Sequence, residues 1–210
     1  MSSAEGVQSK ALVDRVKAIL MKPKEEWPVI AAEKTDIATL FRTYVIPLAA
    51  IGPVANAIGG ALIGTNLPVV GAVRVPFTNA IVGAIVAFAL SLLGMYVVAR
   101  VIDYFAPRYG GTRDLTQAFK VSAYSSTAQW VAGIFALIPA LSPLSILGIY
   151  GLYLLYLGLP AVMKVPAEKA MSYTVAVVVA VIVVFIVIGI VSGIVIGTAA
   201  YVTLMSAKTA

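Results

Sequence analysis

The sequence contains no cysteine and no histidine, and only 11% of its 210 residues are charged. The chain therefore cannot form disulfides, bind metals through thiolates or imidazoles, or use a thiol nucleophile or an imidazole base. Carboxylates, hydroxyls and lysines are the reactive groups that remain. We expect no enzymatic activity, no metal site and no cofactor.

Hydrophobic residues take the place of the missing charges and make up 61% of the chain. Soluble domains are about 45–50% apolar and about 25% charged. A soluble domain of 21.9 kDa has no interior large enough to bury so much apolar surface. The composition excludes a soluble enzyme and a disordered chain, and it predicts an integral membrane protein.

The few charges leave three long apolar stretches. Residues 43–99 contain only Arg74, whereas residues 121–163 and 170–207 contain no charge at all. One crossing needs about 20 apolar residues, so we expect an all-α fold: a bundle of five transmembrane helices preceded by a short interfacial amphipathic helix. The expected spans are Leu40–Gly64, Phe77–Ile102, Phe119–Leu141, Leu144–Met163 and Tyr173–Leu204.

Turn-forming residues mark the connections between these spans. A cluster of Gly, Pro and Asn between Thr65 and Pro76 separates the first two spans. Ser142 and Pro143 are expected to join the third and fourth, since Ser caps a helix and Pro is tolerated in its first turn. The last segment is longer than one crossing requires but contains no Pro, Asn or Asp. It therefore favours one tilted helix over a sixth span.

The basic residues predict the orientation. With five spans, 13 of the 15 Lys and Arg residues fall on the side of the N-terminus, and only Arg74 and Lys208 fall on the other. The positive-inside rule then predicts a cytoplasmic N-terminus and an outer C-terminus. This accounts for the net charge of +6 without a nucleic-acid partner. The expected organisation is a cytoplasmic segment over residues 1–35, a membrane domain over 36–205 and an outer tail over 206–210.

Apolar residues recur at helical spacing in the N-terminal segment, and basic residues take the other face. A basic amphipathic helix followed by Trp is typical of a segment lying in the headgroup plane. Pro23 and Pro28 are expected to end helical structure around the Trp. The alternative is a docking helix for a soluble partner. The expected interfacial anchor consists of Leu12, Val16, Ile19, Leu20 and Trp27.

Polar residues are ordered within the third expected span. Ser122, Ser125, Ser126 and Gln129 follow helical spacing and form one polar intramembrane stripe. We expect this stripe to make hydrogen bonds between helices, which contribute about 0.6–2 kcal/mol each in membranes. The alternative is that it lines a groove for a small solute or a lipid headgroup.

Small residues repeat every four positions in several spans, which permits close approach of helices. Such seams serve packing within the bundle or a homo-oligomer, and the sequence does not separate the two. In the second span the repeat is Asn79, Gly83, Ala87 and Ser91. The other expected seams are Gly189, Gly193 and Gly197 in the last span, and Gly60 and Gly64 in the first.

Two blocks of sequence resemble the core of bacterial Yip1-domain proteins. The first is Ala123-Tyr124-Ser125-Ser126 after Phe119-Lys120, and the second runs from Tyr150 to Pro166. Lys22-Pro23 with Glu26-Trp27 is similar to the short N-terminus of bacterial members. The resemblance covers roughly residues 35–200 and implies five spans, a cytoplasmic N-terminus and a location in a bacterial cytoplasmic (inner) membrane. Eukaryotic relatives are associated with prenylated Rab-type GTPases, a partner that does not carry over to a bacterium, and no catalytic residues accompany the family.

We expect a non-enzymatic membrane scaffold or adaptor that binds other membrane proteins, itself or lipid. The alternative is a small uncoupled transporter, channel or lipid-handling protein that uses the polar stripe. No ionisable residue lies near the middle of an expected span. Since such residues mark proton relays and ion-coupled carriers, their absence argues against a proton-driven transporter.

Overall fold

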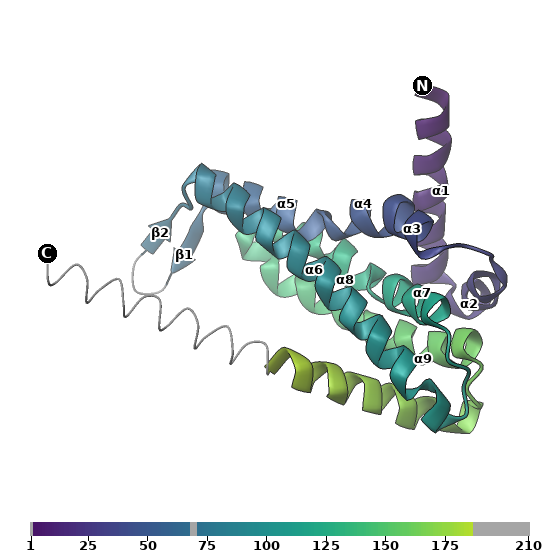
Figure 1. Cartoon of the computed structure of the whole chain (residues 1–210). Coiled ribbons are helices and arrows are strands. Elements are labelled where there is room, and N and C mark those ends of the chain that lie inside the picture. The colour runs from purple at the N-terminus through teal and green to yellow at the C-terminus, as the bar shows by residue number, and fades with distance from the viewer. Residues whose placement is uncertain (1, 68–70, 187–210) are drawn as a thin grey trace, which may run out of the picture.

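The computed structural model describes residues 2–67 and 71–186, and within these it describes only the backbone of residues 2–10, 65–67 and 71–73. Figure 1 shows an elongated bundle of helices whose long axes run roughly along one another. The N-terminal helix α1 (Ser2–Met21) meets one end of this bundle and projects away from it.

The first apolar stretch is a helix of irregular winding. Pro47 and Pro53 each remove a backbone donor from this stretch, and its turns over Phe41–Val45 and Gly59–Ile63 have the wider π-type winding. At its start, the Asp36 carboxylate accepts the Thr39 N–H, which holds the pKa of Asp36 below its usual range. At its end, Gly64 has φ of 80°. The elements are α3 (Ile37–Leu40), η1 (Phe41–Val45), α4 (Ile46–Ala49), α5 (Ile51–Ile58) and η2 (Gly59–Ile63).

A small β-hairpin follows, where the sequence indicated only turns. Strand β1 (Thr65–Leu67) pairs antiparallel with β2 (Gly71–Val73). The expected all-α fold therefore holds for the bundle but not for this connection. The hairpin leads into α6 (Phe77–Phe105), whose 29 residues reach about 43 Å at 1.5 Å per residue. The 3₁₀ turn η3 (Ala106–Tyr109) ends it.

The next helical stretch lies at the centre of the bundle. It consists of α7 (Leu115–Ser125), α8 (Thr127–Ala132) and η4 (Gly133–Leu137). Its first helix packs against α6 and α9 (Tyr150–Met163), and residues 118–125 are all buried. This stretch corresponds to the third expected span. Ser122, Ser125 and Thr127 are buried, whereas Gln129 is exposed.

The connection to the following helix lies earlier than expected. The chain leaves helical geometry at Ile138, which has φ −114° and ψ 104°, and not at Ser142 and Pro143. The physical reason is Pro139, because a residue that precedes proline is driven out of the helical region. The 3₁₀ helix η5 (Pro139–Ile149) then continues into α9.

The last described helix runs back along α6. After η6 (Ala167–Lys169), residues 170–186 are helical. The Tyr173 hydroxyl donates to the Ile102 carbonyl at 2.5 Å, and a Cβ on Gly94 would meet the ring of Phe185. Tyr173 thus lies beside Ile102, while Phe185, further along its helix, lies beside Gly94, further back on α6. The two helices are therefore antiparallel.

Four helical stretches among the described residues are long and apolar enough to cross a membrane. They are Ile37–Ile63, Phe77–Tyr109, Pro139–Met163 and Ala167–Ile186. Residues 115–137 are not among them, because Lys120, Gln129 and several Ser residues lower the mean hydropathy of this stretch. The described part of the chain therefore shows a helical membrane protein with four candidate spans, and the five-span count stays a prediction.

The N-terminal segment packs into the bundle. Ile19 is 0% and Trp27 1% exposed, while Leu12, Val16 and Leu20 cover the same core cluster. This differs from the expected anchor facing headgroups. Helix α1 ends at Met21, just before Pro23 as expected, but Trp27 and Pro28 lie inside helix α2 (Pro23–Ala32), so the expectation that Pro28 ends helical structure was wrong. Pro23 occupies the first turn, where no N–H is required.

A charged cluster joins this segment to the central helix. Arg15 forms ion pairs with Glu26 and Glu33. Lys120, 3% exposed, donates to the backbone carbonyl of Ile30 at 3.0 Å and to that of Glu33. The last carbonyls of a helix have no intrahelical partner, and Lys120 supplies one for α2. The N-terminal segment is therefore part of the folded body.

Candidate functional site: an uncharged polar groove between the helices

Two connected cavities lie between the helices. The hairpin-side chamber, about 700 Å³, lies among α5, α6, η4 and η5 near the β-hairpin. The loop-side chamber, about 730 Å³, lies among α6, α7, α9 and the helix over 170–186. Ser91, Gln129, Trp130 and Ser145 line both chambers. We call the two chambers together the polar groove.

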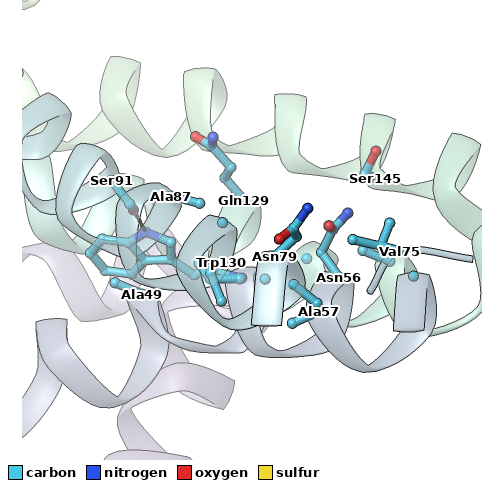
Figure 2. A pocket seen from close by; sticks show the side chains of 18 residues that line it. Ala49, Asn56, Ala57, Val75, Asn79, Ala87, Ser91, Gln129, Trp130 and Ser145 are labelled. Atoms are coloured by element: carbon cyan, nitrogen blue, oxygen red, sulfur yellow. Dashed lines mark hydrogen bonds between the residues drawn. The ribbon is translucent and has the colours of Figure 1, made fainter. Parts of the chain in front are cut away.

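Side-chain amides and hydroxyls supply the polarity of the hairpin-side chamber. Asn56 comes from α5, Asn79 from α6, Gln129 from α8 and Ser145 from η5. Figure 2 shows these four side chains around the same space, with the two asparagine amides close together. Four elements far apart in sequence thus bring uncharged hydrogen-bonding groups to one cavity.

The four-residue repeat of α6 forms the wall of this chamber. Asn79, Gly83, Ala87 and Ser91 all line it. A Cβ built on Gly83 would meet no atom of the described residues within 4 Å. The small side chains therefore leave space along this face of α6, and no helix of the described parts of the chain fills it.

Trp130 forms the boundary between the two chambers. Its indole Nε1–H donates to the Ser91 hydroxyl at 3.2 Å, drawn as the dashed line in Figure 2. The Trp130 side chain is buried, so its bond fixes the ring between α8 and α6. Gln129, the preceding residue, is exposed into the groove.

The predicted polar stripe lines the loop-side chamber. The Ser122 hydroxyl donates to the Met95 carbonyl at 2.7 Å, and the Ser126 hydroxyl to the Ser122 carbonyl at 2.8 Å. Ser125 is 7% exposed, and its hydroxyl has no partner among the described residues. Only Ser122 makes the expected bond to another helix, whereas the Ser125 hydroxyl oxygen is fully covered and Gln129 is exposed in the groove.

The groove is uncharged and long. Among the described residues that line it there is no Asp, Glu, Lys or Arg. Its lining on α6 extends from Asn79 to Val98, a rise of about 28 Å at 1.5 Å per residue. The hydrocarbon core of a bilayer is about 30 Å thick. On α6 only Asn79 and Ser91 of this lining are polar, and Ser122, Ser125, Ser126 and Gln129 add polar residues along the loop-side chamber.

The predicted glycine seams have other roles or lie elsewhere. A Cβ on Gly60 would only touch the Val75 side chain at 3.5 Å, and Gly64 ends its helix. Close backbone approach occurs instead at Gly59, where a Cβ would lie 2.5 Å from the Ala136 carbonyl oxygen. It occurs again where Gly133 meets Gly52. Gly189, Gly193 and Gly197 lie outside the described residues.

Sequence reasoning did not assign Asn56, Trp130 or Ser145 to a site. One available signal was that Asn56 and Asn79 are amides within otherwise apolar helices, which is costly in a membrane and often functional. The Arg15 cluster was also missed, since its members come from three separate segments. No group of three or more Asp, Glu, His or Cys residues suited to a metal occurs in the described parts of the chain.

Apolar spans arranged around an interior groove define this chain as a polytopic α-helical membrane protein. Within that class it belongs to the Yip1 domain family, whose family model matches residues 17–189. The match confirms the resemblance seen in the sequence and extends it into α1. The matched region thus includes Trp27 and the packed N-terminal segment.

Two curated relatives are similar in sequence to this chain over most of its length. The chain is 26% identical over 166 residues to the inner membrane protein YohC of Escherichia coli strain K12. It has the same identity to YohC of strain O6:H1. Each alignment covers 77% of this chain and 85% of the relative. No solved structure matches the chain.

Proposed function

We propose that this protein is a non-enzymatic, uncoupled lipid-handling protein whose polar groove admits lipid headgroups and lets them pass between leaflets. The observation that carries the proposal is the uncharged lining of the two chambers, in which polar residues from several helices recur beside about 28 Å of α6. The acyl chains would stay in the surrounding lipid while the headgroup follows the groove.

The energetic argument rests on headgroup solvation. Moving an unpaired hydroxyl or amide from water into hydrocarbon costs about 4–8 kcal/mol. Asn56 and Gln129 supply side-chain amides that are exposed in the groove. A headgroup in the groove therefore exchanges water for protein partners and avoids most of this cost. No energy source is required, because the groove lowers a barrier without favouring either leaflet.

The scaffold or adaptor function receives less support. Its first proposed contact surface was the N-terminal helix, and Ile19 on that helix and Trp27 on α2 are buried in the chain's own core. Its second was the set of small-residue seams. A Cβ on Gly60 would only touch Val75, Gly64 ends its helix, the repeat on α6 lines the groove, and Gly189, Gly193 and Gly197 lie outside the described residues. The lining residues on which the lipid-handling function rests are among those that the structure describes.

We also propose five spans in a bacterial inner membrane, with the N-terminus in the cytoplasm and the C-terminus outside. The name of the Escherichia coli relative supports the location, and the basic residues support the orientation. Reporter fusions at Arg108 and Lys208 should report opposite sides. Signals from the same side would contradict the five-span topology.

The test uses purified protein in liposomes that carry a fluorescent lipid in both leaflets. Dithionite, which does not cross the membrane, should quench only the outer leaflet in protein-free liposomes and both leaflets when the protein is present. Gly83→Trp should abolish quenching of the inner leaflet, because its side chain enters the free space of the hairpin-side chamber. Ile85→Trp is the matched control, since Ile85 on the same helix is 62% exposed and lies outside the groove lining. Quenching of the outer leaflet alone, with every lipid tried, would refute the proposal.

A further inference from the structure

We infer that the polar groove selects an uncharged, hydroxyl-rich headgroup, as in a glycolipid, over a phosphate headgroup. This inference rests on the proposed function and specifies its ligand. It is drawn from the kinds of polar group that face the groove and from the kinds that do not.

The first argument is charge. A phosphate group buried away from water needs cationic or strongly donating partners, because an unpaired buried anion is far costlier than an unpaired hydroxyl. Among the described lining residues none is cationic. The nearest cation in the sequence is Arg74, which adjoins the lining residue Val75 and is itself exposed and not part of the lining. The groove therefore offers no ion pair to a phosphate.

The second argument is the balance of donors and acceptors. An amide side chain offers two N–H donors and a carbonyl acceptor, and a hydroxyl offers one donor and two lone pairs. The groove presents three such amides, Asn56, Asn79 and Gln129, in one chamber (Figure 2). A phosphate only accepts hydrogen bonds, which would leave the amide oxygens unpaired. A sugar hydroxyl both donates and accepts, so it can satisfy both ends of each amide.

The third observation is a buried hydroxyl in the loop-side chamber. Ser125 Oγ has no partner among the described residues, although the residue is 7% exposed. Buried polar atoms without partners are uncommon in native structures. Its neighbours Ser122 and Ser126 both donate to backbone carbonyls. Ser125 lines the loop-side chamber, and rotation of its side chain would bring this covered hydroxyl to a hydroxyl-bearing ligand there, which would supply the missing bond.

The ligand is a lipid and not a free sugar, since the same groove has apolar walls. Val181, Ile182 and Phe185 line the loop-side chamber together with the serines. Phe185 and Ile182 belong to a helix apolar enough to span a membrane. A free sugar gains nothing from such walls, whereas acyl chains beside a headgroup contact them.

The experiment exploits the absence of cysteine from the natural chain. In the full-length protein in detergent, Ser145→Cys places one thiol at the groove, where Ser145 is exposed. The rate of its reaction with a maleimide is measured against rising amounts of monoglucosyl diacylglycerol, phosphatidylglycerol with the same acyl chains, or methyl glucoside. We expect the glycolipid to protect the thiol at concentrations at least about tenfold lower than the phospholipid does.

A second variant reverses the preference. Gln129→Lys in the Ser145→Cys background places a cation at the junction of the two chambers, so phosphatidylglycerol should then protect at least as well as the glycolipid. Ile85→Lys in the same background is the control, and should leave the preference unchanged because Ile85 lies outside the groove lining.

Each outcome supports or overturns the inference. Equal protection by both lipids in the parent variant would overturn the headgroup selectivity and leave the proposed function standing. Equal protection by methyl glucoside would show a soluble sugar ligand and overturn the assignment to a lipid. Absence of protection by any of the three would overturn the inference and the proposed function together. Protection by the glycolipid alone, reversed by Gln129→Lys, would support it.

Discussion

Trp27 offers the sharpest test of how the N-terminal segment is held. Its indole ring is 1% exposed and lies against Gly158 of α9, where a Cβ would come within 2.7 Å of the ring. It also meets Tyr124 edge to face, with 6.3 Å between ring centroids. We therefore predict that Trp27→Ala leaves a cavity inside the protein and destabilises the whole bundle.

The expected loss follows from the size of the cavity. Replacing a buried Phe or Trp by Ala costs about 3–5 kcal/mol in the free energy of unfolding. For a chain of 150–250 residues, 1 kcal/mol corresponds to about 2–4 °C in the melting temperature. Trp27→Ala should therefore lower the melting temperature by about 6–20 °C. The loss is one of packing, because the Trp27 indole N–H has no hydrogen-bond partner among the described residues.

Thermal unfolding in detergent measures this directly. The chain has two Trp residues, so in Trp27→Ala the fluorescence reports Trp130 at the centre of the bundle. Met21→Ala is the control, since Met21 is 79% exposed on the same segment and surface substitutions stay within about 0.5 kcal/mol. A headgroup anchor would lose membrane attachment but keep its bundle intact. A melting temperature for Trp27→Ala equal to that of Met21→Ala would refute the packed position of Trp27.

Three further predictions concern the central helix and its contacts. Lys120→Met should cost about 1.5–3 kcal/mol in unfolding free energy, because it removes a charged donor from the carbonyls that end α2. Faster proteolysis of the N-terminal segment would show this loss. A cleavage rate like that of the wild type would contradict this role of Lys120. Ser122→Ala should cost about 0.6 kcal/mol, and at most about 2 kcal/mol, because it loses the hydrogen bond to the Met95 carbonyl. Ser125→Ala should cost nothing measurable in a thermal melt, since the Ser125 hydroxyl has no partner among the described residues. A larger loss for Ser125→Ala than for Ser122→Ala would contradict these hydrogen bonds. Gly151→Ala should cost about 1–3 kcal/mol in unfolding free energy, since its Cβ would lie 2.6 Å from the Ser125 carbonyl oxygen. Gly83→Ala should be tolerated, because the space around Gly83 is open. Equal melting temperatures of the two variants would exclude the close contact at Gly151.

The positions of most apolar helices could be predicted from the sequence because hydropathy depends on composition alone. Phe77, where the second expected span begins, is also the first residue of α6. Met163 likewise ends both the fourth expected span and α9. The start of that span was misplaced because Ser142-Pro143 and Ile138-Pro139 both carry turn signals. The sequence does not show which proline the chain turns at.

The site could be predicted only in part, because a groove depends on which faces meet. Helical spacing identified Ser122, Ser125, Ser126 and Gln129 as one stripe, and all four line the groove. It could not show that Asn56 from another span would line the same chamber as Gln129. In the same way, the amphipathic pattern of residues 12–20 reveals an apolar face but not whether lipid or protein covers it. Tertiary packing decided both.

The central claim is that the groove brings polar, water-compatible surface into the depth of the membrane. The most direct measurement is the reaction of Gln129→Cys with a charged, water-soluble thiol reagent in native membranes, compared with Ile85→Cys on the outer face of α6. We predict rapid modification of Gln129→Cys and none of Ile85→Cys, since Gln129 is exposed in the groove and Ile85 lies outside it. If Gln129→Cys reacted as slowly as Ile85→Cys, the groove would be dry and closed, and the proposed passage of lipid headgroups through it would be refuted.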